Sequence, residues 1–341
     1  MKAVRLFLII ALAVSFSASG ILAQEDNVKL IVPLGWLNND EFVALQVADQ
    51  LGFFAEQGIE ITLVSGGGST GFDPIMAVNG FDSSIRFGVP AALSQVITAR
   101  SKGIDIVAIA ALQQYEPSGF LTIITDERRA QSPCDFAGRV VAMQPDTTWY
   151  VDALGAMCPK EKGGPLLSGK DFTVIPAGWS PDCLLTGDCD FYCSWTTNQP
   201  FVLAEMGMIE GVDYEIFLTS DFLPFYYVDV IVTTRSFASE NPSLVRRFVT
   251  AAMQGLDYTI QHPDEAISIT SKVPGVTLEH ATWRIPVQNS LAISPETEEH
   301  GLGYIDLDKV QAMINLLYEL GQIDVLLDAG DVIDNSFLAN P

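Results

Sequence analysis

Short apolar runs alternate along the chain with segments whose apolar residues have helical spacing. The runs at 28–34 and 59–64 predict strands, and the stretch 41–54 between them predicts a helix with Asn38 or Asn39 as its N-cap. The alternation continues, with helices expected at 73–80 and 91–103 and strands at 104–112, 120–126, 139–144, 172–177, 189–195 and 228–235. This order is typical of an α/β fold with mostly parallel sheets.

The order of the strands indicates two lobes. A second unit of strands begins near Gly119, and the strand at 228–235 returns the chain to the first unit. Helices dominate after that strand, and they are predicted at 241–261, 262–273 and 307–321. A chain of 341 residues is long enough to bury a core in each lobe.

The first 23 residues have the pattern of a secretory signal peptide. Lys2 and Arg5 precede the apolar run 6–16, and small residues lead to Ala23. The apolar run is too short for a membrane anchor. We therefore expect cleavage after Ala23 and a soluble, exported mature protein.

The chain is strongly acidic. Its formal net charge is −24, and it becomes −26 when the two basic residues within 1–23 are removed. Such a charge repels nucleic acid and anionic lipid, so we expect neither as a partner. Solubility in a salty habitat is a second explanation for the charge.

All five cysteines lie close together in the middle of the chain. Because disulfides form in exported proteins, Cys134–Cys158 and one pair among Cys183, Cys189 and Cys193 are candidates. The spacing matches no standard zinc motif and no histidine lies nearby, so we expect no metal site.

A glycine-rich loop follows the predicted strand 59–64. Gly66, Gly68 and Gly71 form the G-x-G-x-x-G pattern of dinucleotide-binding proteins. That pattern also needs an acidic residue about 20 positions later, where the stretch 91–100 has none. We therefore expect no nucleotide cofactor, and the backbone N–H groups of this loop are available to another ligand.

No catalytic constellation is recognisable in the sequence. The histidines, His262, His280 and His300, lie in the C-terminal helical part and are interpreted as surface or capping residues. The motifs G-x-S-x-G and H-E-x-x-H do not occur. These observations predict a binding protein rather than an enzyme.

Four of the five tryptophans stand in or next to turn-like stretches that follow predicted strands: Trp36, Trp149, Trp179 and Trp195. Ligands of open α/β sheets bind where such loops converge, and an indole face can stack on a planar ring. We therefore expect these side chains to meet a planar solute, with packing between the lobes as the alternative.

Several stretches resemble the periplasmic solute-binding proteins of ABC importers. The similar branch includes binders of thiamine pyrimidine precursors, riboflavin, alkanesulfonates, taurine and nitrate. The stretches cover nearly the whole mature chain in the family's order, and they are 35–69, 99–117, 143–150, 178–200 and 241–248. The W-x-x-N opening, the W-Y pair and the T-N-x-P turn look most like the subgroup that binds thiamine pyrimidine precursors.

The resemblance implies a two-lobe periplasmic binding protein fold of type II, with a mostly parallel sheet flanked by helices in each lobe. Lobe one would comprise 27–115 and 228–341, and lobe two 116–227. The residues that the resemblance implies for the interlobe cleft are Trp36, Asn39, Gly67, Gly68, Gln114, Trp149, Tyr150, Asn198, Gln199, Tyr227 and Asp229. Trp195 is added to them because of its place among the tryptophans that follow predicted strands.

The resemblance also implies how such a protein works. It would act in the periplasm as a monomer, close on a small molecule by hinge motion, and deliver it to an ABC permease and ATPase at the inner membrane. Neither a cofactor nor a metal is implied.

Three positions depart from the family pattern. Phe42 replaces the histidine usual in pyrimidine binders and looks more like the riboflavin branch, Gln199 replaces a glutamate, and Arg86 replaces a glycine. Basic residues are nearly absent from the expected cleft loops, with Arg86 as the one near candidate. This favours a neutral or weakly cationic heteroaromatic solute over a sulfonate, taurine or nitrate.

Two other function classes are alternatives to a transport protein. The fungal relatives that synthesise the pyrimidine use a run of cysteines at the return crossing, and the segment 222–230 of this chain contains neither cysteine nor histidine. A pyrimidine synthase is therefore disfavoured. An exported sensor or adhesion domain with the same fold would leave no motif of its own.

Overall fold

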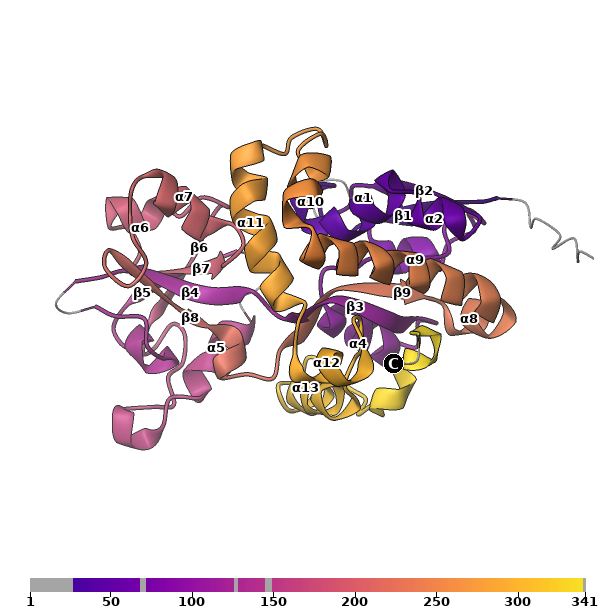
Figure 1. The fold of residues 1–341 in the computed structure, drawn as a ribbon. Helices are drawn as coiled ribbons and strands as arrows, with labels where there is room; N and C mark the ends of the chain where they lie inside the picture. Colours follow the sequence, from indigo (N-terminus) through magenta and orange to yellow (C-terminus); the bar gives the residue numbers. More distant parts are fainter. Residues whose placement is uncertain (1–26, 68–71, 126–127, 145–148, 340–341) are drawn as a thin grey trace, which may run out of the picture.

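The computed structural model describes residues 27–67, 72–125, 128–144 and 149–339. The predicted signal peptide lies outside these ranges. Figure 1 shows two groups of elements joined by the long strands β3 and β9. The group on the left of Figure 1, from β4 to η5, is called lobe two here, and the other elements form lobe one.

Lobe one contains two pairs of strands. They are β1 (Val28–Pro33) with β2 (Ile59–Val64), which are parallel, and β3 (Val107–Tyr115) with β9 (Tyr226–Thr233), which are antiparallel. Single bridges from Leu34 to Val89 and from Gly88 to Val232 connect the two pairs through one short segment.

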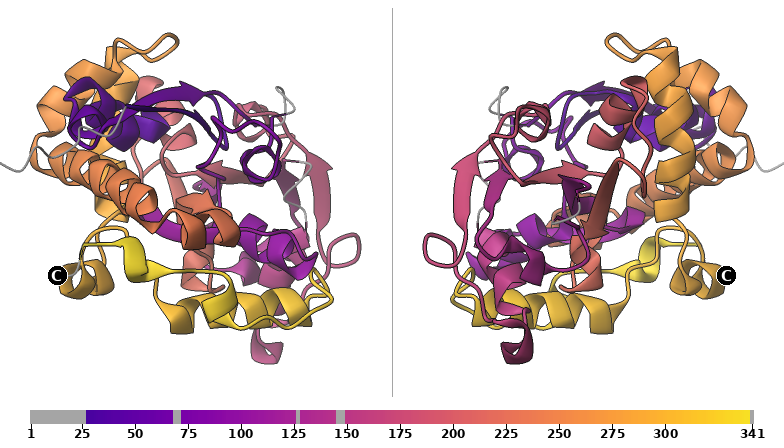
Figure 2. Two further views of the ribbon diagram at one scale, coloured as in Figure 1. Left: turned by 90° about the vertical axis from the view of Figure 1, so that its right-hand side faces the viewer. Right: turned by 90° about the vertical axis from the view of Figure 1, so that its left-hand side faces the viewer.

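Most helices belong to lobe one. Helices α9 and α13 lie on opposite sides of the β3–β9 pair, as Figures 1 and 2 show. The helices of lobe one are η1 (Asp40–Phe42), α1 (Val43–Gln50), α2 (Phe53–Glu56), α3 (Pro74–Val78), α4 (Leu93–Ser101), α8 (Arg235–Glu240), α9 (Pro242–Gln261), α10 (Pro263–Thr270), α11 (Leu278–Leu291), α12 (Pro295–His300), α13 (Leu307–Glu319), η6 (Ala329–Asp331) and η7 (Asn335–Phe337).

Lobe two is built around one five-stranded sheet in the order β6-β5-β7-β4-β8. The sheet is mixed, because β5 is parallel to β6 and β7 while β4 is antiparallel to β7 and β8. Its strands are β4 (Ser118–Ile123), β5 (Val140–Met143), β6 (Thr173–Pro176), β7 (Phe191–Trp195) and β8 (Tyr214–Leu218), and its helices are η2 (Pro133–Phe136), α5 (Trp149–Ala156), η4 (Lys160–Lys162), α6 (Asp182–Thr186), α7 (Gln199–Glu205) and η5 (Thr219–Asp221).

The α/β class and most predicted elements are confirmed, whereas the expectation of mostly parallel sheets is wrong, because β3 with β9 and β4 with both β7 and β8 pair antiparallel. The strand expected at 104–112 begins three residues later and extends to Tyr115. The strand β8 and the helices α5, α6, α7, α8, α11 and α12 had no predicted counterpart. Helix α11 escaped prediction because it contains Pro286 and its apolar positions form no clear stripe.

Apolar burial explains why α9 forms where its sequence predicts. Asn241 and Pro242 start the helix, and Val245, Phe248 and Ala252 are fully buried on one face. The Phe248 ring stacks on Phe87 at a centroid distance of 4.0 Å. Burying side chains of this size stabilises the fold by about 1.5–3 kcal/mol each.

Two disulfides stabilise lobe two. They join Cys134 to Cys158 and Cys183 to Cys189, while Cys193 is buried with a free thiol. Both pairings were among the candidates from the sequence. Within the described ranges, no helix has the length and apolar character needed to cross a membrane.

Candidate functional site

Three tryptophan side chains surround one small cavity between the lobes. This tryptophan cavity has a volume of about 90 Å³, and it is lined by Gly35, Trp36, Glu41, Ala91, Trp179, Trp195, Asn198 and Arg284. Lobe one supplies Trp36, whereas lobe two supplies Trp179 and Trp195. An apolar cavity with a few polar groups at a domain boundary is the usual form of a small-molecule site.

The fold explains why these indoles meet. Trp36 follows β1, Trp179 follows β6, and Trp195 is the last residue of β7. The carboxyl ends of these strands therefore face the gap between the lobes, as expected for ligand sites of open sheets. The Trp36 and Trp179 rings lie 4.8 Å apart with an interplanar angle of 58°.

Gly67 shapes the cavity next to Trp36. Its φ angle is +87°, and a Cβ atom at this position would come within 2.8 Å of Trp36 Cε3. Gly67 also lines a second cavity of about 410 Å³, which shares Gly35, Trp36, Ala91, Trp179 and Trp195 with the tryptophan cavity. Together the two cavities reach the size that holds a small ligand.

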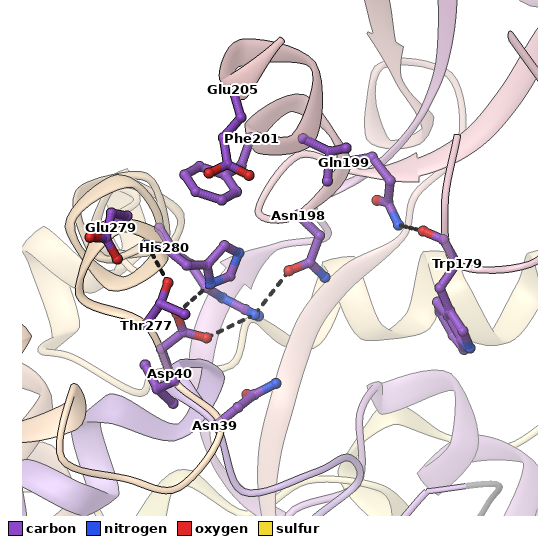
Figure 3. A pocket seen from close by; sticks show the side chains of 14 residues that line it. Asn39, Asp40, Trp179, Asn198, Gln199, Phe201, Glu205, Thr277, Glu279 and His280 are labelled. Atoms are coloured by element: carbon purple, nitrogen blue, oxygen red, sulfur yellow. Dashed lines mark hydrogen bonds and ion pairs between the residues drawn. The ribbon is translucent and has the colours of Figure 1, made fainter. Parts of the chain in front are cut away.

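Gln199 fixes the positions of two tryptophan loops. Its Oε1 accepts a hydrogen bond of 2.8 Å from the backbone N–H of Trp195, and its Nε2 donates one of 3.1 Å to the carbonyl oxygen of Trp179. Gln199 is buried, and Figure 3 shows its amide directed at the Trp179 backbone. It therefore supports the cavity wall.

A larger cavity of about 520 Å³ lies on the other side of Trp179 and Arg284. This outer cavity is drawn in Figure 3, and its lining includes Asn39, Asp40, Trp179, Asn198, Gln199, Phe201, Glu205, Glu279, His280 and Arg284. Asn39 caps η1 by accepting a hydrogen bond of 2.9 Å from the Glu41 N–H. Phe201 contacts His280 across the lobes, at a centroid distance of 4.9 Å.

Arg284 is the main functional side chain that the sequence did not reveal. It is buried in α11, and its guanidinium donates to Asp40 Oδ1 (3.3 Å), Glu41 Oε2 (3.1 Å) and Asn198 Oδ1 (3.1 Å). The expectation that Arg86 is the near candidate for a cleft cation is wrong, because Arg86 instead lies over the Phe237 ring at 5.3 Å.

His280 was interpreted as a surface or capping residue, and this interpretation is wrong. Its ring Nδ1 lies 2.6 Å from Asp40 Oδ2, which is itself buried. The α11 helix therefore brings both His280 and Arg284 to the acidic residues that follow β1. Among the described residues, no group of three or more His, Cys, Asp or Glu side chains could hold a metal ion.

Three residues expected in the cleft are directed elsewhere. Gln114 donates to the carbonyl of Tyr304, the Tyr150 hydroxyl lies 2.7 Å from Cys193 Sγ, and the Tyr227 hydroxyl accepts from the Asp306 N–H. All three of the expected residues are buried, and none lines the tryptophan cavity. The position of each residue in the sequence did not reveal the direction in which its side chain points.

Asp229 lies directly behind the cavity wall. It is fully buried, and Gln113 Nε2 donates to its Oδ2 at 2.8 Å. Burial, and then the charge of Glu41, raise the pKa of Asp229 well above its ordinary value. Tyr227 and Asp229 have φ angles of 63° and 52°, a backbone conformation that is strained for residues other than glycine.

The remaining predicted positions carry less information. Gly68 lies outside the described residues, as does the side chain of Trp149. Phe42 is completely buried in the core of lobe one and lines none of the three cavities described above. The resemblance of Phe42 to the riboflavin branch therefore does not place its side chain at any of these cavities.

The fold is that of the periplasmic binding proteins. It superposes on the periplasmic aliphatic sulphonate binding protein SsuA of Escherichia coli with a TM-score of 0.63 at 13% identity, covering 89% of this chain and 96% of that one. Residues 39–266 match the family described as NMT1/THI5 like. The chain belongs to this family, which confirms the resemblance seen in the sequence.

Curated relatives of this chain differ in their ligands. It is 24% identical to the riboflavin-binding protein RibY of Chloroflexus aurantiacus, over 93% of this chain and 88% of that protein. It is also 24% identical to the formylaminopyrimidine-binding protein of Halalkalibacterium halodurans, over 70% and 68%. A 4-amino-5-hydroxymethyl-2-methylpyrimidine phosphate synthase of Legionella pneumophila is 24% identical over 71% and 72%.

Proposed function

We propose that the protein is the extracytoplasmic substrate-binding component of an ABC importer and that it captures a small heteroaromatic solute. The observation that carries this proposal is the convergence of Trp36, Trp179 and Trp195 on one cavity from both lobes. Indole faces favour a planar ring, with about 0.5–1.5 kcal/mol for each stacked pair beyond the burial of area. A ligand between such surfaces would draw the lobes together.

Hinge closure is the proposed mechanism. Lobe one, residues 27–115 and 228–341, and lobe two, residues 116–227, would rotate about the two crossings at β3 and β9. The contacts of Trp36 with Trp179 and of Arg284 with Asn198 join the lobes in the present arrangement. The permease of the importer would recognise this closed form in the periplasm.

The charge around the cavity favours a heteroaromatic solute of the thiamine-precursor type over an organic anion. A sulfonate or nitrate requires a guanidinium that is free to pair with it. Arg284 does line the cavity, but it already contacts two carboxylates, Asp40 and Glu41. Riboflavin and formylaminopyrimidine, named for two of the relatives, are both heteroaromatic.

We also propose that the protein is not an enzyme. The relative named as a pyrimidine phosphate synthase shows that such activity is known among similar proteins. The return crossing of this chain, 222–230, lacks cysteine and histidine, and Arg284 is engaged in ion pairs with Asp40 and Glu41.

Calorimetric titration of the mature protein tests the proposed ligand class. The panel comprises formylaminopyrimidine, riboflavin and an alkanesulfonate. We expect one of the heteroaromatic compounds to bind and to raise the Tm, because a ligand that binds the folded state stabilises it. Preferential binding of the sulfonate would contradict the proposal.

A further inference from the structure

The wall of the tryptophan cavity brings together two carboxyl groups that interact electrostatically. Glu41 lines the cavity, and Asp229 lies behind it, where burial and then the charge of Glu41 raise the pKa of Asp229. Asp229 has no solvent exposure. Two carboxyl groups that interact in this way cannot both be charged at low cost, so a positive charge beside them would relieve their repulsion.

The nearby cations do not balance the carboxyl groups. Arg284 is divided between Glu41 and Asp40, and His280 contacts only Asp40 of these groups. The one hydrogen-bond donor that reaches the Asp229 side chain within the described ranges is the neutral amide of Gln113. Among these groups, therefore, neither cation contacts Asp229, and the one cation that contacts Glu41 is shared with Asp40.

Two buried acceptors near this pair have no donor. Asp229 Oδ1 and Gln113 Oε1 are both without a hydrogen-bond partner in the part of the chain that the structure describes. Leaving such a group unpaired costs about 1–3 kcal/mol. The backbone of Asp229, with φ 52°, is also held in a strained conformation, and its N–H donates to the carbonyl of Ala91, another lining residue. Strain of this kind gathers at ligand sites.

We propose that the tryptophan cavity selects a solute that carries a protonated nitrogen on its aromatic ring system. Glu41 would be the counter-ion of that nitrogen, and Asp229 and Gln113 would position the Glu41 carboxylate. This inference rests on the proposed binding function and narrows it to cationic aromatic solutes. The three indoles support it independently, because tryptophan is the side chain that attracts a cation over its ring most strongly.

A matched pair of probes tests the proposal. Benzamidine is a planar aromatic cation, and benzamide is its neutral counterpart with nearly the same shape. We expect the mature protein to bind benzamidine at least about tenfold more tightly than benzamide. In Glu41→Gln, which keeps the size of the side chain, this preference should disappear.

Two further variants keep the test decisive. Glu205→Gln is the control, because Glu205 lines the outer cavity and not the tryptophan cavity, and its preference should equal that of the wild type. Asp229→Asn should reduce the preference and serves if Glu41→Gln does not fold.

The results of these titrations distinguish a failure of the cationic selectivity from a failure of the proposed binding function. Equal affinity for both probes, failure of benzamidine to bind, or an unchanged preference in Glu41→Gln would overturn the cationic selectivity. If Trp195→Ala leaves the affinities of both probes unchanged, the tryptophan cavity is not the binding site, and the proposed function fails with it.

Discussion

Arg284 in α11 donates a hydrogen bond of 3.1 Å to the side-chain oxygen of Asn198 in lobe two, so one buried guanidinium joins the two lobes. The same guanidinium is shared between the carboxylates of Asp40 and Glu41 in lobe one. This one side chain therefore contributes both to the contact between the lobes and to the charge of the cavity.

We expect Asn198→Ala to open the ligand-free protein, because the variant removes the bond to Arg284 and leaves the pairs within lobe one intact. Small-angle X-ray scattering should show a larger radius of gyration than in the wild type. Arg235→Gln is the control, since Arg235 contacts Asp331 within lobe one. An unchanged radius in Asn198→Ala would show that this bond does not hold the lobes together.

Replacing Arg284 itself should have a different effect. Arg284→Gln leaves Asp40 and Glu41 without their shared cation, and breaking a buried ion pair in this way costs about 3–5 kcal/mol. Urea denaturation should show this loss in the free energy of unfolding. A loss below about 1 kcal/mol would mean that solvent reaches and screens these carboxylates.

Gly67→Ala should weaken ligand binding by displacing the Trp36 ring. The new Cβ would lie 2.8 Å from Trp36 Cε3. Gly103→Ala is a matched control, because Gly103 has a similar φ of +80° and no atom within 4 Å of the added Cβ. Both variants should lose about 1–2 kcal/mol of stability from backbone strain, and calorimetry should show loss of affinity in Gly67→Ala alone.

The raised pKa of Asp229 predicts a defined pH dependence. Between the ordinary value of 3.8 and the raised value, the folded protein holds this proton more tightly than the unfolded chain, so stability falls as pH rises. Asp229→Asn does not titrate, and asparagine tolerates a φ of 52°.

Thermal denaturation from pH 3.5 to 8 checks this prediction. The stability of Asp229→Asn relative to wild type should improve as the pH rises. Asp82→Asn should show the opposite sign, because the hydrogen bond from the Ser84 hydroxyl lowers the pKa of Asp82. A constant difference between Asp229→Asn and wild type would contradict the raised pKa.

The two disulfides should differ in their contribution to stability. Cys134 and Cys158 are separated by 24 positions, whereas Cys183 and Cys189 are separated by 6. Chain entropy predicts losses of about 3.4 and about 2.2 kcal/mol when each pair is replaced by serine. Guanidinium denaturation of the two double variants measures both values, and a larger loss for the shorter loop would oppose the entropic explanation.

Local patterns in the sequence were sufficient for much of the fold and part of the site. Apolar runs located β1, β2 and α9 because each buries a periodic face. The positions of Trp36 and Trp195 after strands placed them at the cavity, because the ends of strands converge whatever the details of the lobes.

Contacts between distant segments could not be read in the same way. Arg284 meets Asp40 across 244 positions of the chain, and no local pattern specifies such a contact. One signal was available: Ala281, Arg284, Ile285 and Gln288 share one helix face, and a charge on a face that is otherwise buried indicates a buried partner. Tyr150 and Tyr227 were expected in the cleft because the resemblance assigned their positions in the sequence. It could not show the direction in which each side chain points.

Calorimetric titration of Trp36→Ala and Trp195→Ala with the best heteroaromatic ligand is the most direct test of the tryptophan cavity. Trp283→Ala is the control, because Trp283 contacts Phe201 and does not line that cavity. We predict that each cavity variant binds at least about tenfold more weakly than wild type, with little change in the control. Wild-type affinity in both cavity variants would show that these indoles only pack the lobes together.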